Sequence, residues 1–131
     1  MAYSYQNNNN QLTQAIDGTN TAYGYNAFGI LITEVKSGTT RTFTYNDAQR
    51  LVSVTENSTT LGQYTYDALG RRTKKVVGET TTLYLYDQNG SLIEECGSDG
   101  SWQKDYLYLN GQTLTMIVAS SPENVITTMI T

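Results

Sequence analysis

The residue types that most often carry out enzymatic chemistry are scarce in this sequence. There is no histidine, which excludes Ser-His-Asp and Cys-His catalysis and removes the commonest metal ligand. The single cysteine, Cys96, cannot form a zinc site or an internal disulfide by itself. Glu94 and Glu95 are adjacent, so on a strand they point to opposite faces and cannot act as a catalytic pair. We therefore predict no catalytic residue, no metal site and no cofactor, and a chain that is not an enzyme.

Two short motifs have both a chemical and a structural interpretation. Asp87, Asn89 and Glu94 carry oxygen ligands, but their spacing misses the EF-hand calcium loop. Asn57-Ser58-Thr59 fits the N-glycosylation sequon. We interpret both as polar turns.

Charge and hydropathy restrict the partners of the chain. The formal net charge is -4, which argues against nucleic acid because phosphate binding needs a basic surface. The one basic run comprises Arg71, Arg72, Lys74 and Lys75, and strand alternation divides these side chains between two faces. No apolar run is long enough to span a membrane, and Met1–Asn10 has no signal-peptide apolar stretch.

Pairs of aromatic residues recur along the whole chain and indicate tandem repeats. The two aromatic residues of a pair are separated by one residue, and successive pairs are 20 to 22 residues apart. The six pairs are Tyr3/Tyr5, Tyr23/Tyr25, Phe43/Tyr45, Tyr64/Tyr66, Tyr84/Tyr86 and Tyr106/Tyr108.

A turn signal follows most of these pairs. An Asn or Asp comes directly after the second aromatic residue, and a Gly comes three residues later. Three middle units show this pattern, as Asn26/Gly29, Asp67/Gly70 and Asp87/Gly90. A fourth has Gln in place of Gly, as Asn46/Gln49. The first side chain can accept hydrogen bonds from amides further along, and the Gly can adopt the left-handed conformation of a bulge beside a type I turn. Gln49 breaks the rule, so it either takes a positive φ at a cost or uses another turn.

A second set of turn signals lies between the units, at Asp17-Gly18, Ser37-Gly38, Glu56-Asn57-Ser58, Gly78-Glu79 and Gly97-Ser98-Asp99-Gly100. Each unit therefore reads strand, turn, strand, turn, and no segment reads as a helix. We predict an all-β antiparallel meander of about a dozen strands, forming a curved open sheet or partial shell. Residues 1–117 form the repeat domain. Residues 118–131 form a non-repeat tail that is either truncated or of artificial origin.

The turns also predict the strand register. Tyr25 should lie opposite Leu31, Tyr45 opposite Leu51, and Tyr86 opposite Leu92, which builds a Tyr/Leu ladder on one face. The other face carries a partly apolar set, namely Thr44, Val52, Val54, Thr65, Leu85 and Ile93. A single layer with two such faces needs a cover, a partner or an enclosed interior.

The unit Tyr64-Thr65-Tyr66-Asp67-Ala68-Leu69-Gly70-Arg71 resembles the consensus of the Rhs/YD-repeat family, and the units at Tyr84–Gly90 and Phe43–Asn46 agree with it. The resemblance covers residues 3–117. It implies a β-sheet wound into a hollow shell, as in bacterial toxin-complex proteins, wall-associated proteins and teneurins. The implied structural repeat residues are Tyr23, Tyr25, Gly29, Tyr45, Tyr64, Tyr66, Asp67, Gly70, Tyr84, Tyr86, Asp87, Gly90, Tyr106 and Tyr108. No residue matches the self-cleavage site of the family, so that activity is not carried over.

These features predict a structural role. The chain would be a non-catalytic segment of a β-shell that encapsulates or displays a toxin, effector or adhesive domain. It would act at the cell surface or after secretion, as part of a larger bacterial protein. The alternative is a carbohydrate- or protein-binding module that uses exposed aromatic residues, with Trp102 as the best single candidate. Its open edges predict self-association through sheet edges or a face.

Overall fold

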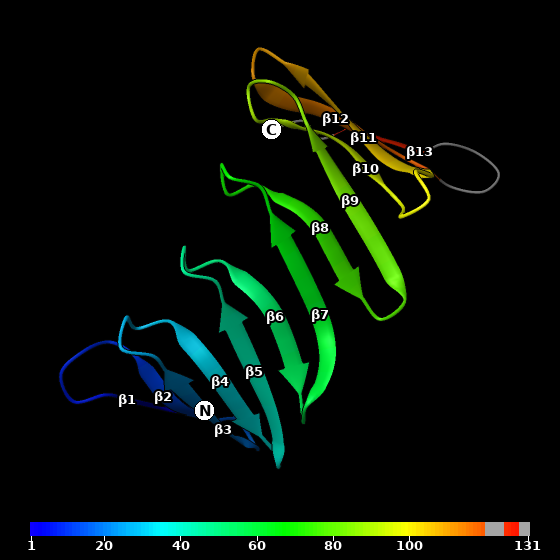
Figure 1. Cartoon of the computed structure of the whole chain (residues 1–131). Coiled ribbons are helices and arrows are strands. Elements are labelled where there is room, and N and C mark those ends of the chain that lie inside the picture. Colours follow the sequence, from blue (N-terminus) through cyan, green and yellow to red (C-terminus); the bar gives the residue numbers. More distant parts are fainter. Residues whose placement is uncertain (120–124, 129–131) are drawn as a thin grey trace. The chain divides into compact units, whose positions relative to one another are not determined.

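A computed structural model describes residues 1–119 and 125–128 and shows an all-β antiparallel fold (Figure 1). No helix occurs within these residues, as the sequence predicted. The strands are β1 (Ala2–Tyr5), β2 (Leu12–Ile16), β3 (Asn20–Tyr25), β4 (Leu31–Lys36), β5 (Thr39–Tyr45), β6 (Leu51–Glu56), β7 (Thr59–Tyr66), β8 (Arg72–Val77), β9 (Thr80–Tyr86), β10 (Leu92–Cys96), β11 (Trp102–Leu109), β12 (Gln112–Val118) and β13 (Val125–Thr128).

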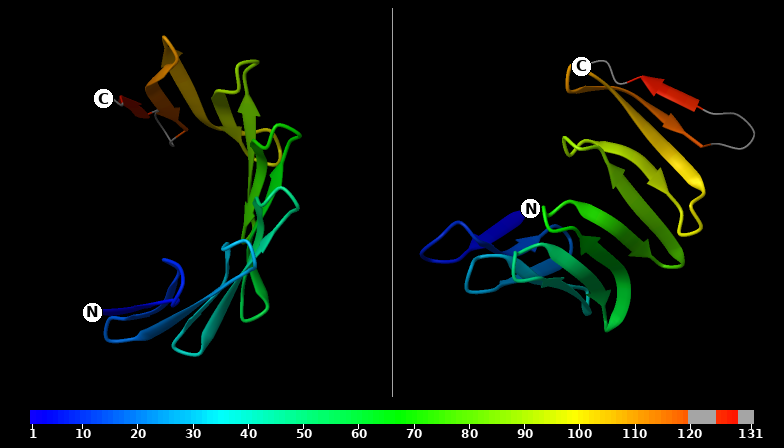
Figure 2. Two further views of the ribbon diagram at one scale, coloured as in Figure 1. Left: turned by 90° about the vertical axis from the view of Figure 1, so that its left-hand side faces the viewer. Right: turned by 45° about the horizontal axis from the view of Figure 1, so that its top comes forward.

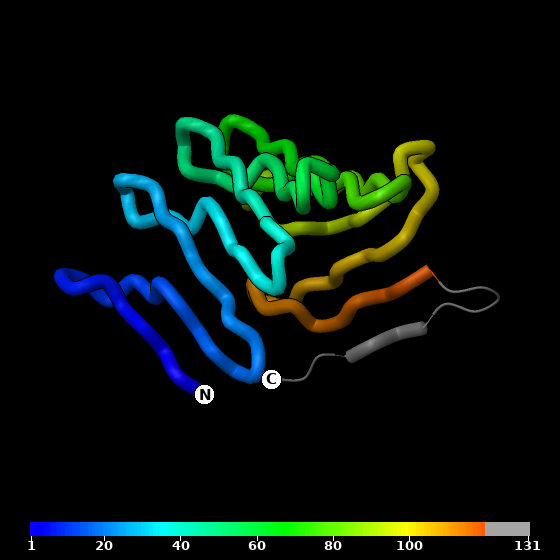
Figure 3. The backbone as a smooth tube through the Cα atoms, turned by 90° about the horizontal axis from the view of Figure 1, so that it is seen from below, coloured from blue at the N-terminus to red at the C-terminus, as the bar shows by residue number. Residues whose placement is uncertain are grey.

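The chain divides into two compact units, Met1–Gln63 and Tyr64–Thr131, with the boundary inside β7. Within each unit the strands follow the order of the chain and pair antiparallel with their neighbours. Figure 3 traces these consecutive hairpins, and Figure 2 shows how strongly their strands twist. Each unit is therefore a meander, as predicted.

Two kinds of turn alternate along most of the chain. We call the four-residue turns after the tyrosine pairs wide turns. In a wide turn, the amide of the first turn residue donates to the carbonyl of the residue directly after the turn, as in Asp67 N to Arg71 O (2.9 Å). The others are tight turns of two residues, such as Ser37-Gly38, where both φ angles are positive (51° and 77°). Positive φ at both positions gives the type I′ geometry that matches the twist of a hairpin.

The predicted register is confirmed beside the tyrosines. Tyr25 pairs with Leu31, Tyr45 with Leu51, and Tyr86 with Leu92. Directly after each of these leucines one residue has no direct partner, so the register shifts there by a β-bulge. The same shift occurs next to Leu12 in the first hairpin.

The bulge overturns one part of the predicted face assignment. Val54 was expected on the face opposite the tyrosines, yet it pairs directly with Phe43 and shares its face. The prediction was wrong because Val52 is the extra residue in β6, and a one-residue shift moves every later side chain to the other face.

Within the described residues, each unit is a sheet one layer thick without a closed core. Among the described residues, no side chain is less than 2% exposed, and Cys96 is the single buried hydrophobic residue. Large apolar side chains are widely exposed, including Phe28 (79%) and Leu69 (75%) at wide turns. Burial in this fold therefore comes from neighbouring strands within the layer.

Candidate functional site

The wide turns are organised by the Asn or Asp that opens them. The Asp87 Oδ1 atom accepts hydrogen bonds from the amides of Asn89 (2.9 Å) and Ser91 (2.8 Å). Asn26 Oδ1 holds the amides of Phe28 and Ile30 in the same way, at 3.0 Å each. In the Asp67 turn, Arg71 donates its amide to Oδ1 and its Nε to Oδ2 (2.9 and 2.7 Å). These contacts with Arg71, above all the backbone hydrogen bond, lower the pKa of Asp67.

The fourth residue of a wide turn takes a left-handed conformation. Gly29, Gly70 and Gly90 have φ of 79°, 83° and 88°. Gln49 also takes a positive φ, 58°, so the first of its two predicted alternatives holds. A side chain in this region is strained because Cβ approaches the following carbonyl.

The sixth unit does not follow the predicted turn order. Gly97–Gly100, expected between units, has the hydrogen bonds of a wide turn, with Gly97 N to Ser101 O at 2.7 Å and Gly100 N to Gly97 O at 3.1 Å. The turn after Tyr108 is instead a tight turn at Asn110-Gly111, with φ of 52° and 78°. The reason is local. Leu109 follows Tyr108 in place of the Asn or Asp that opens a wide turn, and the next two residues, Asn110-Gly111, favour a two-residue turn.

The second-position tyrosines Tyr25, Tyr86 and Tyr108 make the same hydrogen bond, which we call the tyrosine clamp. The hydroxyl donates to the backbone carbonyl of the residue that begins the preceding strand. The bonds are Tyr25 to Leu12 (2.9 Å), Tyr86 to Arg72 (2.8 Å) and Tyr108 to Leu92 (2.8 Å). In each case the backbone pairing of the two strands ends before this point, at Gln14–Ala22, Lys74–Leu83 and Glu94–Asp105. The hydroxyl therefore spans a gap where the strands separate and satisfies a carbonyl outside the ladder.

Tyr45 occupies the corresponding position in β5 and makes no clamp within the described residues. Its neighbour β4 pairs with β5 only as far as Thr33–Thr42. A hollow of about 550 Å³ lies there, lined by Ile32, Phe43, Tyr45 and the flanking wide turns. Where the clamp is missing, neighbouring hairpins are separated by an open space.

Contacts between successive repeats also involve the residue just after a wide turn. Arg71 bonds to Asp67 in its own turn, and its guanidinium lies over the ring of Tyr86 in the next repeat, 4.9 Å from the centroid. It also lies beside Gly90, where an added Cβ would be 3.8 Å from Arg71 Nη1. Arg72 lies over the ring of Tyr64 at 4.8 Å. Arg71 therefore links Asp67 of its own repeat with Tyr86 and Gly90 of the next repeat.

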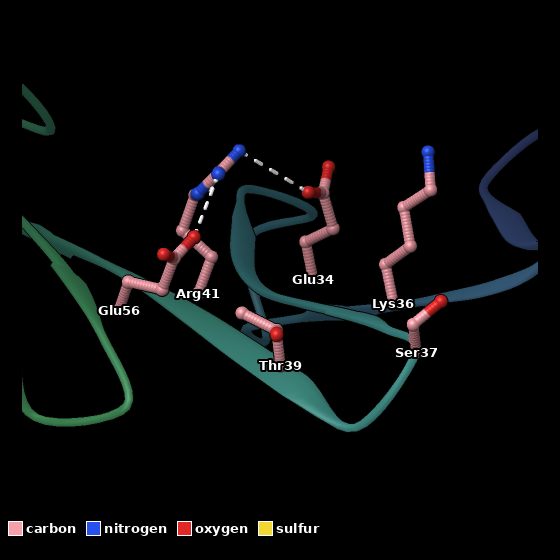
Figure 4. A pocket seen from close by; sticks show the side chains of 6 residues that line it. All are labelled: Glu34, Lys36, Ser37, Thr39, Arg41 and Glu56. Carbon is pink, nitrogen blue, oxygen red and sulfur yellow. Dashed lines mark hydrogen bonds and ion pairs between the residues drawn. The ribbon is translucent and has the colours of Figure 1, made fainter.

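A row of charges crosses the tyrosine face of the first unit near its tight turns (Figure 4). Arg41 lies between two carboxylates on the flanking strands, with Glu34 at 3.4 Å and Glu56 at 2.8 Å. The three residues are direct cross-strand partners. They line a hollow of about 420 Å³ together with Lys36, Ser37 and Thr39. These pairs are partly exposed, so each is worth only a fraction of a kcal/mol.

A second polar cluster, in the other unit, is more deeply placed. Glu95 is 8% exposed and accepts hydrogen bonds from Tyr106 Oη (2.6 Å) and Lys104 Nζ (3.2 Å). Burial, together with the bond to Glu95, raises the pKa of Tyr106. The sequence marks Tyr106 as a repeat residue but does not reveal its contact with Glu95, because that contact depends on the register that pairs Glu95 with Lys104.

Cys96 and Trp102 face each other across β10 and β11. The thiol is buried, and burial raises its pKa, which favours the unreactive thiol form. Trp102 is half-buried, and its indole Nε1 is buried without a hydrogen-bond partner. The binding role of Trp102 stays a prediction.

No group of three or more His, Cys, Asp or Glu side chains in residues 1–119 and 125–128 is arranged to hold a metal ion. No helix in the same residues is long and apolar enough to cross a membrane.

Comparison with solved structures supports the fold. The chain is similar to the crystal structure of TcdB2-TccC3-Cdc42, with a TM-score of 0.60 and 23% identity over 75% of this chain. It is also similar to the crystal structure of TcdB2-TccC3-TEV, with a TM-score of 0.61 and 18% identity over 87% of this chain. The chain spans only 5% and 7% of the lengths of those two chains.

Comparison with sequences gives the family. No curated protein matches this chain. The family model described as the teneurin YD-shell matches residues 32–128, which include the unit at Phe43–Asn46 and the later tyrosine pairs. The chain therefore belongs to the teneurin YD-shell family.

Proposed function

We propose that this chain is a non-catalytic wall segment of an Rhs/YD-repeat β-shell, which encapsulates or displays a toxin, effector or adhesive domain. The observation that carries the proposal is the tyrosine clamp, which Tyr25, Tyr86 and Tyr108 make with the same geometry. A bond repeated at this period joins successive hairpins into a continuous sheet, which is what a wall requires.

The exposure pattern supports this role. A single layer that buries no large side chain fully leaves apolar groups open on both faces. Monomeric soluble proteins rarely expose apolar surface on this scale without a partner. In a shell, the enclosed material would be that partner, because one face of the wall contacts it.

In the proposed shell, this chain is one part of a larger protein. Residues 1–117 would be the repeat wall and residues 118–131 a segment outside the repeat. The parent would be a larger secreted or cell-surface bacterial protein, its enclosed effector domain would be the main partner, and copies of this chain would associate through their open edges.

The natural protein that contains this chain provides the test. We expect limited proteolysis to spare both the repeats and one further domain, and electron microscopy to show a hollow particle. A triple variant, Tyr25→Phe, Tyr86→Phe and Tyr108→Phe, should expose that domain to protease, because each change removes only a clamp hydroxyl. A matched Tyr45→Phe variant should leave the domain protected. Solid particles, or a domain that is digested equally in wild type and triple variant, would refute the proposal.

A further inference from the structure

An open hollow lies beside two neighbouring wide turns of the first compact unit, those that follow β3 and β5 (Figure 1). Its volume of about 550 Å³ is in the range of ligand-binding pockets. The lining is largely aromatic and aliphatic and includes Phe28, Ile30, Phe43 and Tyr45. Phe28 is 79% exposed, so its ring is available to a partner without rearrangement.

A later repeat shows what fills the equivalent space. Arg71 directly follows a wide turn, and its guanidinium lies 4.9 Å from the ring centroid of Tyr86, the second aromatic residue of the next pair. It also lies beside Gly90, the fourth residue of the next wide turn. A single cation therefore covers the ring and reaches the turn that follows that ring.

The hollow has the same three positions but lacks the cation. Counted from the wide turns, the counterparts of Arg71, Tyr86 and Gly90 are Ile30, Tyr45 and Gln49. All three counterparts line the hollow. Ile30 carries no charge, and within the described residues no guanidinium lies over the Tyr45 ring and no clamp engages its hydroxyl. The hollow is therefore the space that a guanidinium occupies in the later repeat.

Asp47 gives this hollow a negative charge. It is the one charged residue among the described residues that line the hollow, and its carboxylate forms no ion pair within the described part of the chain. Aromatic ring faces attract cations, and a carboxylate adds to that attraction. A guanidinium suits this combination because it is planar and weakly hydrated, and can stack on a ring while donating to a carboxylate.

We propose that this hollow binds an arginine side chain presented by another protein. The guanidinium lies over the Tyr45 ring and donates hydrogen bonds to the Asp47 carboxylate, while the aliphatic stem packs on Phe28. The arginine comes from another molecule because no described residue of this chain supplies the cation. This inference goes beyond the proposed wall role and does not depend on it.

A titration of the full chain, followed by two-dimensional NMR, tests the site with N-acetyl-arginine amide as the probe. N-acetyl-citrulline amide is the matched control, because it has the same shape without the charge. We expect the arginine probe to shift the amide signals of Phe28 and of residues 43–49. It should bind about fivefold more tightly than the citrulline probe.

Substitutions test the same site from the protein side. Asp47→Asn removes the carboxylate charge at an exposed turn position and should weaken arginine binding about three- to fivefold. Ile30→Arg supplies an internal guanidinium at the counterpart of Arg71 and should abolish measurable binding, whereas Ile30→Leu should bind like wild type. Circular dichroism checks that each variant keeps its sheet, and Asp47→Asn decides alone if Ile30→Arg does not fold.

Absence of arginine binding, or equal binding of the arginine and citrulline probes, would overturn the arginine site. So would arginine binding that Asp47→Asn leaves unchanged, or signal shifts confined to other parts of the chain. None of these results bears on the wall role, which rests on the tyrosine clamp and is tested on the natural protein by proteolysis and electron microscopy.

Discussion

At the scale of single residues, the two positions of the aromatic pair have different physical tasks. The second position is Tyr in all six units, whereas the first is Phe in one of them, at Phe43. The clamp gives the hydroxyl a task at Tyr25, Tyr86 and Tyr108, where it bonds to a backbone carbonyl that the ladder leaves unpaired. A ring without a hydroxyl can pack equally well, but it cannot replace that bond.

Removing one clamp hydroxyl should therefore destabilise the fold. Tyr86→Phe keeps the ring over which Arg71 lies but leaves the Arg72 carbonyl without its partner. We expect a loss of about 1 kcal/mol in the free energy of unfolding, measured by urea denaturation. Tyr45→Phe is the matched control, since Tyr45 makes no clamp in the described residues, and it should change stability by only a few tenths of a kcal/mol. Equal effects of the two substitutions would contradict the role of the clamp.

The pair formed by Glu95 and Tyr106 predicts a dependence on alkaline pH. Burial and the bond to Glu95 raise the pKa of Tyr106 in the folded state, so folding favours the neutral phenol. This contribution is complete below the unfolded pKa of about 10 and is lost as the pH rises toward the folded value. Unfolding free energies measured between neutral pH and about pH 11 should fall less steeply in Tyr106→Phe than in wild type. Parallel pH profiles would exclude Tyr106 as the group responsible.

At the scale of elements, the turns were the most predictable feature. Asn or Asp followed by Gly three residues later predicts a hairpin turn. The position of each turn then set the strand register of Tyr25, Tyr45 and Tyr86. The bulge after each leucine was not predicted, because no residue type marks it: Ile32, Val52 and Ile93 are ordinary strand formers. The face of Val54 and the cluster at Glu95 depend on this register, so alternation alone could not place them.

The wide turn at Gln49 offers a stabilising substitution. Gln49 has a φ of 58° where the other middle repeats have Gly. Gln49→Gly should relieve about 1 to 2 kcal/mol of left-handed strain and lose about 0.5 to 1 kcal/mol through the greater freedom of the unfolded chain. We expect a net gain of about 0.5 to 1 kcal/mol by thermal or urea unfolding.

The reciprocal substitution is the control. Gly90→Gln places a side chain at a φ of 88° and should destabilise the chain by about 1 kcal/mol. If Gln49→Gly also lowers stability, then the Gln49 side chain must contribute contacts that outweigh its backbone strain.

At the scale of the whole molecule, stability has to come from neighbouring strands. The absence of a closed core in the described residues means that each hairpin is held by the hairpins beside it. Such proteins behave as chains of local units whose stabilities and interfaces add. Composition and period predicted this one-layer architecture. They did not predict the boundary between Gln63 and Tyr64, since both sides of it carry the same repeat.

This local dependence predicts that the two units respond separately to damage. In Tyr86→Phe, the amides of β8 to β10 should lose about fivefold of their hydrogen-exchange protection, which corresponds to the loss of about 1 kcal/mol. The amides of β2 to β5 should keep theirs. Tyr25→Phe, which removes the clamp to Leu12, should give the opposite pattern. Hydrogen exchange read by mass spectrometry resolves both regions in one experiment. A uniform loss along the chain in either variant would show that the sheet unfolds as a single cooperative body, and the nearest-neighbour account of its stability would then be wrong.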